Sequence, residues 1–367
     1  MNRDNLLSLY DRLTQLVEKL PGGLQKPILR ELVPIRELFL QQRPARLMLL
    51  GAAGKSVPEF LHAIAGITVE TGDSRDQWRF YRSGSHGEIW ILDARQDTPQ
   101  SVVEVALAAL PPDAALFLRE SDNDALSAES ASQRLALAGT ELPVVGISLT
   151  PGDSARARLS ALMAAERVFS TRRNTVCSID HPPAVCEAIC AALPDPARLE
   201  FARITSAREA QAQIAGTLLK SFTAVCGVIG LQPIPLADMP ILTTLQSFMV
   251  GLIVYTSGKK VSARLFAEFL GAMGLSIGAG MLFRESARAL VKIIPLWGNT
   301  VSGMVAGAGT YAIGRAAIAY FIEELPIAEA KKLFNNLLPG WDAFKRRRLP
   351  SLPGRTKKEA LPPKLDS

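Results

Sequence analysis

Apolar positions in the first half of the chain alternate between short runs and helical stripes. Two amphipathic helices are predicted first, over residues 4–20 and then up to about residue 42. Runs such as RLMLL (46–50) and EIWILD (88–93) then predict buried strands. The predicted order after residue 45 is strand 46–50, helix 55–65, strands 77–82 and 88–93, helix 100–110, strand 114–118, helix 124–138, strand 143–149, helix 154–166, strand 175–179 and helix 182–193.

Strands that alternate with helices predict a mostly parallel sheet covered by helices on both faces. The single step from strand 77–82 directly to strand 88–93 predicts one antiparallel edge strand. This order is typical of small GTPase domains. We therefore expect an α/β P-loop GTPase-like domain over residues 44–194, preceded by the amphipathic helices of residues 1–43.

The second half of the chain has a different pattern. A charged helix over residues 195–213 is expected to mark the boundary. Beyond it lie 20 uncharged residues at 239–258 and 22 at 293–314. Twenty residues span about 30 Å as a helix, which is the thickness of a bilayer core. We expect an all-α hydrophobic helical domain over residues 195–338.

Charge placement argues against a simple pair of membrane spans. The intervening loop, 259–292, carries six basic residues, and a hairpin of the two apolar stretches would export it. Basic residues in short loops favour the cytosolic side of a membrane. Two interpretations stay open: the helices form a bundle that docks on a membrane, or they insert only partly.

The formal net charge of +6 is concentrated at the C-terminus. Residues 345–367 hold eight basic and two acidic side chains, so the remainder of the chain is balanced. We therefore expect no specific nucleic-acid binding by the body of the protein. The segment 339–367 is predicted to be a basic disordered tail, which either keeps the protein soluble or is attracted to anionic lipid head groups.

The sequence LMLLGAAGKS places a glycine-rich turn directly after a predicted strand and before a predicted helix. A phosphate-binding loop reads G-x-x-x-x-G-K-[ST], in which backbone amides and lysine hold phosphate and the hydroxyl holds Mg²⁺. Gly51, Gly54, Lys55 and Ser56 supply a version that is two residues short. They are the predicted nucleotide-binding residues of this loop, with Ser56 as a ligand of Mg²⁺.

A second candidate motif ends the predicted strand 88–93. GTPases place a D-x-x-G motif there, whose aspartate reaches Mg²⁺ through water and whose glycine amide senses the γ-phosphate. Asp93 matches the aspartate, but Gln96 stands in place of the glycine. Asp93 is therefore a second predicted Mg²⁺ ligand, while the side chain at Gln96 is expected to obstruct the phosphate.

A third candidate motif follows the predicted strand 143–149. The guanine-binding pattern is [NT]-K-x-D, and the chain offers Thr150 and Asp153 at its ends. Pro151 replaces the lysine that lines the base. Asp153 is a candidate acceptor of hydrogen bonds from guanine, although an aspartate that caps a loop explains it equally well.

The helical half resembles the YcjF-type domain that often follows an Era-like or immunity-related-like GTPase domain in bacteria. Two blocks carry the resemblance, LQPIPLADMPILTTLQSFMVGLIVY and LVKIIPLWGN…AGTYAIGRAAIAYF, which lie within residues 205–325. The matching positions are Pro233, Pro235, Asp238, Gln246, Met249, Tyr255, Lys292, Pro295, Gly298, Thr310, Gly314, Tyr320 and Phe321. The resemblance implies a membrane-associated GTPase-like protein at the cytoplasmic face of the bacterial inner membrane.

Two functional hypotheses follow. The first is a membrane-associated switch that binds GTP with Mg²⁺ weakly and hydrolyses it little or not at all. The second is a nucleotide-free pseudo-GTPase, in which the α/β domain is an interaction module and the helical domain makes membrane contacts or contacts with other copies of the chain. The shortened loop, Gln96 and Pro151 favour the second hypothesis, whereas Lys55, Ser56, Asp93 and Asp153 together favour the first.

Overall fold

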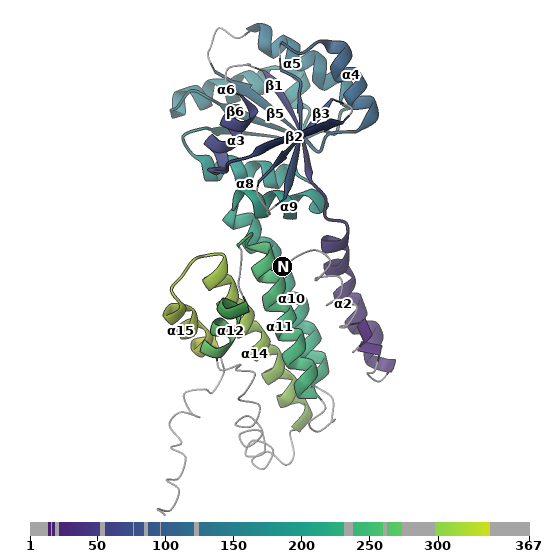
Figure 1. Cartoon of the computed structure of the whole chain (residues 1–367), viewed down its shortest axis with the longest axis vertical. Helices are drawn as coiled ribbons and strands as arrows, with labels where there is room; N and C mark the ends of the chain where they lie inside the picture. The colour runs from purple at the N-terminus through teal and green to yellow at the C-terminus, as the bar shows by residue number, and fades with distance from the viewer. Residues whose placement is uncertain are drawn as a thin grey trace, which may run out of the picture.

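The computed structural model describes residues 14–15, 17–18, 22–51, 56–75, 77–83, 87–95, 97–120, 125–230, 238–259, 263–273 and 298–337. An α/β unit lies at one end of the molecule, and long helices extend from it (Figure 1). Of the helix expected over residues 4–20, the described residues 14–15 and 17–18 are helical. The second expected helix is α2 (Gly22–Leu40).

A seven-stranded sheet forms the centre of the α/β unit, in the order β2-β3-β4-β1-β5-β6-β7 (Figure 1). Strand β1 pairs in parallel with β4 and β5, and β5, β6 and β7 continue in parallel. Strand β3 is antiparallel to both β2 and β4. The strands are β1 (Ala45–Gly51), β2 (Glu70–Arg75), β3 (Trp78–Arg82), β4 (Glu88–Asp93), β5 (Ala114–Arg119), β6 (Val144–Ser148) and β7 (Asn174–Ser178). The predicted mostly parallel sheet with an antiparallel edge is confirmed.

The hydrophobic pattern does not predict strand β2. Its sequence, ETGDSR, contains no large apolar side chain, and Glu70, Thr71 and Ser74 are exposed. Backbone pairing holds it instead, with Glu70 opposite Arg82 and Thr71 opposite Tyr81. An edge strand needs no buried face, so its side chains carry no periodic signal. The antiparallel edge therefore consists of two strands rather than the single one expected.

Helices cover both faces of the sheet because the parallel strands are apolar on both sides. In β1, Leu47 and Leu49 enter one core, whereas Met48 and Leu50 enter the other. Helices α4, α5, α6 and α7 lie on the second face, and α3, α8 and α9 on the first. Their bounds are α3 (Val57–Ala65), α4 (Gln100–Ala109), α5 (Ala125–Leu137), α6 (Asp153–Ala165), α7 (Arg167–Ser170), α8 (Pro182–Ala192) and α9 (Asp195–Thr205).

The single helix expected over residues 195–213 is wrong. Helix α9 ends at Thr205, and a new helix, α10 (Arg208–Gly230), begins three residues later. Ser206 ends α9 in the left-handed conformation, with φ of 54°, so the chain turns there. The predicted boundary is therefore a helix–turn–helix joint, with α9 packed on the sheet and α10 leading away from it.

The helical part is a bundle in which α10, α11 (Asp238–Thr256) and α14 (Gly298–Phe321) pack on one another, joined by α12 (Ala263–Ala272) and α15 (Ile327–Leu337). One hydrophobic core runs without interruption from the first face of the sheet through α9 into this bundle. The two parts are thus packed together rather than linked by a free segment.

Gly314 lies where α14 packs closely on α10 and α11. A side chain there would collide with Leu219 of α10 and would lie 2.9 Å from the Cε atom of Met249 on α11. Gly307 faces the backbone of α10 at Thr223 and Gly227. Small residues on α14 therefore let three helices meet without gaps.

Among the described helices, α10 is the one long and apolar enough to cross a membrane by length and composition. Of its most apolar window, 44% is buried inside the protein, and the core helix of a soluble protein passes the same test. The predicted stretch 239–258 forms α11, while part of 293–314 lies outside the described residues. Docking on a membrane, or partial insertion into it, stays a prediction for these stretches.

Candidate functional site

The residues selected from the sequence lie at the carboxyl edge of the parallel strands. Gly51 ends β1, Asp93 ends β4, and Thr150 follows β6. The strand order reverses on either side of β1, and open α/β sheets bind ligands at such a switch point. Gly54 and Lys55 lie outside the described residues. The sheet therefore brings three of the predicted motifs to one edge.

Gly51 is a glycine because two strands come close together there. Its φ is +93°, a conformation that other residues adopt at a cost. A Cβ atom at this position would also collide with the backbone carbonyl of Leu118 in β5. Strand packing therefore accounts for Gly51 without any ligand.

Ser56 is the N-cap of α3 and forms a reciprocal capping box with Glu59. The Ser56 hydroxyl accepts a hydrogen bond from the Glu59 amide at 3.4 Å, and the Ser56 amide donates to Glu59 Oε2 at 3.0 Å. Pro58 lies in the first turn of the helix, where its missing N–H is not needed. The hydroxyl expected to bind Mg²⁺ is thus engaged in capping the start of the helix.

The capping box also occupies an anion site. Free amides at a helix N-terminus attract phosphate through their N–H groups and the helix dipole. Here the carboxylate of Glu59 accepts from the Ser56 amide, so an anion from the chain itself already lies at this end of α3. A phosphate approaching the same amide would meet a negative charge.

Asp93 is paired with Arg95. The guanidinium binds the carboxylate in a bidentate manner, with Nε 2.7 Å from Oδ1 and Nη2 2.6 Å from Oδ2. The Arg95 side chain is 9% exposed and that of Asp93 is 37% exposed. Hydrogen bonding to Asp93 raises the pKa of Arg95 despite its burial. The carboxylate expected to reach Mg²⁺ through water therefore already has both oxygens paired with a cation.

The loop after β4 is held in place by a buried arginine of α5. Arg134 donates to the backbone carbonyl of Ala94 and, at 2.6 Å, to that of Thr98. The Thr98 hydroxyl in turn donates to the Asp93 carbonyl at 2.9 Å. Desolvation lowers the pKa of Arg134, which is nevertheless far above neutrality as an arginine. Gln96 lies outside the described residues, but Arg95 before it and Thr98 after it are anchored.

Thr150 and Asp153 have different surroundings: the first contacts the end of the neighbouring strand and the second is exposed to solvent. The Thr150 hydroxyl donates to the backbone carbonyl of Glu120, at the end of β5. Asp153 begins α6, its side chain is 90% exposed, and it lies 3.3 Å from Arg156 in the next turn. Asp153 thus lies in the first turn of α6, where the helix dipole favours a carboxylate, rather than in the loop that it was expected either to cap or to use for guanine.

Asp180 is a residue at this edge that the sequence analysis missed. Its carboxylate accepts a hydrogen bond from the Gly152 amide at 3.1 Å. The Ser178 hydroxyl and then this amide lower the pKa of Asp180. The sequence feature that could have identified Asp180 is its place two residues after the last parallel strand. The Asp180 carboxylate ties the loop after β6 to the loop after β7. One more polar group at this edge therefore already has a partner within the chain.

Within the described part of the chain, no group of three or more histidine, cysteine, aspartate or glutamate side chains could hold a metal ion. All four cysteines are free and buried. Burial raises the pKa of Cys186 to about 12 and that of Cys226 to about 11, so these thiols stay protonated near neutral pH.

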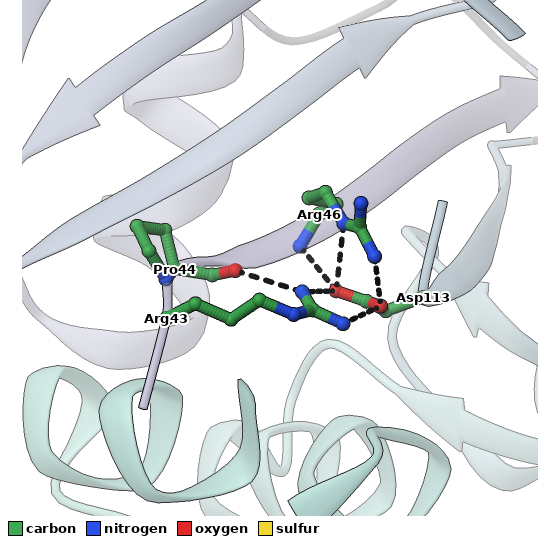
Figure 2. Close-up of polar contacts among 4 residues, drawn as sticks. All are labelled: Arg43, Pro44, Arg46 and Asp113. Atoms are coloured by element: carbon green, nitrogen blue, oxygen red, sulfur yellow. Dashed lines mark hydrogen bonds and ion pairs between the residues drawn. The ribbon is translucent and has the colours of Figure 1, made fainter. Parts of the chain in front are cut away.

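A cluster of one carboxylate and two guanidinium groups lies at the opposite, amino edge of the sheet (Figure 2). Asp113 accepts from Arg43 Nη1 and Nη2, both at 2.6 Å, and from the backbone amide of Arg46 at 2.9 Å. Burial alone would raise the pKa of Asp113, but the hydrogen bonds from Arg43 and Arg46 outweigh it and lower that pKa. The cluster fixes the segment that leads from α2 into β1.

The residues present therefore do not fit a GTP·Mg²⁺ complex at the described part of the edge. Ser56 and Asp93, the two predicted metal ligands, have partners within the chain, and Asp153 points into solvent. The arrangement can hold loops in place and cap helices. The chain matches no protein-family model and no curated protein sequence.

Proposed function

We propose that the protein is a nucleotide-independent pseudo-GTPase, in which a P-loop GTPase-like α/β domain serves as an interaction module on a packed helical bundle. The likeness to the YcjF-type and Era-like families is part of this proposal. One observation carries it: at the edge where a nucleotide would lie, Glu59 and Arg95 already pair with Ser56 and Asp93.

Both intramolecular pairs oppose nucleotide binding. A phosphate must displace Glu59 from the Ser56 amide, and loss of such a cap costs about 1 kcal/mol. Mg²⁺ must displace the Arg95 guanidinium from Asp93. The displaced guanidinium would remain nearby and its positive charge would repel the ion. Asp93 is 37% exposed, so solvent screens part of this pair. The two costs together disfavour binding most strongly for the Mg²⁺ complex of a nucleotide.

A titration tests the proposal directly. A fluorescent GTP analogue is added to the purified full chain with Mg²⁺, beside an ATP analogue and a Lys55→Ala variant. We expect no saturable signal from the wild type up to high micromolar nucleotide. Saturable, guanine-selective binding that is lost in Lys55→Ala would overturn the proposal and make the switch hypothesis primary.

A double variant sharpens this test. Glu59→Gln with Arg95→Gln removes the competing anion and cation while keeping side-chain size. If these groups block the edge, the double variant binds the GTP analogue more tightly than the wild type does, and the gain is larger with Mg²⁺ than without it; unchanged binding would argue against the block. The matched control is Glu104→Gln on α4, which is exposed and lies on the other face of the sheet.

The helical bundle and the basic tail complete the proposal, with an anionic membrane surface as the partner class. The support is the apolar character of α10 and the charge of residues 345–367. Flotation of the full chain with vesicles that contain anionic lipid is the measurement. Binding that is equal for anionic and neutral vesicles, or absent from both, would remove this part of the proposal.

A further inference from the structure

A buried polar cluster joins three segments that are far apart in the sequence. Gln42 follows α2, Glu200 and Arg203 lie on α9, and Tyr255 lies near the end of α11. The Gln42 and Tyr255 residues are 8% and 7% exposed, and the Glu200 and Arg203 side chains 12% and 10%. The cluster lies beneath the sheet, where α2, α9 and the bundle meet.

The four side chains form a closed ring of hydrogen bonds. Arg203 Nη1 donates to Glu200 Oε2 at 3.2 Å and to the Tyr255 hydroxyl at 2.8 Å. The Tyr255 hydroxyl donates to Gln42 Oε1 at 2.9 Å, and Gln42 Nε2 donates to Glu200. The Arg203 guanidinium also lies 3.7 Å from the centre of the Tyr255 ring. A buried network with every member satisfied is rigid, and loss of one member leaves others unpaired.

Helix α9 is held on two sides by close backbone contacts. A Cβ atom at Gly87, in the turn before β4, would collide with the Glu200 carboxylate. A Cβ atom at Gly258, in the turn after α11, would collide with the Arg203 carbonyl. Arg203 Nε also donates to the Tyr255 carbonyl at 3.0 Å, at the C-terminal end of α11. The sheet, α9 and the bundle are therefore fixed to one another.

Helix α2 is peripheral by comparison. A single stripe, formed by Ile28, Leu32, Ile35 and Phe39, buries it against the rest of the core. It runs beside α10 on the outside of the bundle (Figure 1). An open groove of about 390 Å³ remains between its first turns and α10, lined by Lys26, Pro27, Ile28, Arg30, Glu31, Ala224, Val225 and Val228. Helices α10, α11 and α14 also pack directly on one another, in contacts that do not involve α2.

The segment after α2 is anchored on the sheet side. Arg43 is paired with Asp113, and its backbone amide donates to the Pro196 carbonyl at 3.0 Å. Gln42 and Phe39 are the contacts just before this anchor, and both reach Tyr255, with the Phe39 and Tyr255 ring centres 5.7 Å apart. Any movement of α2 away from the bundle must therefore turn about residues 40–43 and break these contacts.

We propose that the ring of Gln42, Glu200, Arg203 and Tyr255 is a latch that holds α2 as a releasable strap on the bundle. With the latch closed, α2 covers one side of α10. When it opens, α2 swings away from the bundle while the sheet, α9, α10, α11 and α14 stay folded. The proposal does not depend on whether the protein binds a nucleotide.

Hydrogen exchange of the full chain, resolved by peptide, tests the latch. In the wild type, the amides of α2 are expected to exchange through a local opening, faster than those of α10 and α14. Tyr255→Phe removes the hydroxyl from the ring and keeps the aromatic packing. It should speed exchange in α2 about tenfold, the effect of losing a hydrogen bond in a charged network, and leave the bundle unchanged.

The matched control is Tyr320→Phe on α14, whose ring packs on Phe269 and Phe321, away from the latch. It should leave exchange in α2 at the wild-type rate. Exchange of α2 together with the whole bundle in the wild type would overturn the proposal without any variant. An unchanged α2 rate in Tyr255→Phe, or an equal rise in every helix, would overturn it as well.

Discussion

The two pairs that occupy the predicted nucleotide ligands at the carboxyl edge join neighbours in sequence, whereas the contact that closes the ring beneath the sheet joins residues far apart. Glu59 follows Ser56 by three positions and Arg95 follows Asp93 by two. In contrast, Gln42 and Tyr255 are 213 positions apart. Local pairs form with little help from the rest of the fold, because bringing sequence neighbours together costs little conformational entropy. Distant pairs exist only in the folded chain and therefore bind its parts together.

The largest loss of stability is expected at Gly51, where the carboxyl edge requires a backbone conformation that only glycine adopts easily. Gly51→Ala forces a side chain into a φ of +93° and against the Leu118 carbonyl. We expect it to lower the free energy of unfolding by about 3–4 kcal/mol, measured by urea denaturation. Gly66→Ala is the control, because Gly66 also has a positive φ but open space around it. It should cost about 1 kcal/mol. Equal losses in the two variants would contradict the proposed collision.

The next largest effect concerns a distant pair. Asp113→Asn removes the charge that binds Arg43 and Arg46, and should cost about 2–3 kcal/mol at neutral pH. The pKa of Asp113 is lowered in the folded protein, so its stabilisation is present above the ordinary aspartate pKa and is lost as the pH falls through the folded value.

The difference between wild type and Asp113→Asn should therefore shrink on going from neutral pH to about pH 3. Urea denaturation at several pH values measures it. Asp153→Asn, at an exposed carboxylate, is the control and should change stability by less than about 0.5 kcal/mol at any of these pH values. A constant loss across the pH range would argue against the charge pair as the cause.

The smallest effect is expected for a local pair. Ser56→Ala and Glu59→Ala each remove half of the capping box and should each cost about 1 kcal/mol. Because either change breaks the reciprocal arrangement, the double variant should cost less than the sum of the two single variants. A double-mutant cycle by thermal unfolding measures this. Strict additivity would show that the two bonds act independently.

The same comparison explains what could be predicted from the sequence. The strands at 46–50 and 88–93 follow from unbroken apolar runs, because a parallel strand is buried on both faces. Strand β2 has no such run and exists through its pairing with β3. The turn at Ser206 contains no glycine or proline, the residues that usually indicate a turn. Helices α9 and α10 therefore appear as one helix in the sequence pattern.

The candidate site divides in the same way. The series Ser56-x-x-Glu59 is a recognisable capping-box signature, so that pair could have been predicted. The capping box is less obvious in the sequence because Ser56 also fits the phosphate-loop pattern. Neither the pairing of Asp113 with Arg43 nor the ring around Tyr255 has a local signal, since their partners meet only after the sheet and bundle assemble.

The central claim is that groups of the chain itself replace a bound nucleotide at the sheet edge. Thermal unfolding of the wild type with and without millimolar GTP and Mg²⁺ tests it most directly, because any ligand that binds only the folded state raises the unfolding temperature. We predict no shift beyond that produced by the same concentration of inorganic triphosphate with Mg²⁺. A rise that is specific to GTP and saturates with its concentration would contradict the account.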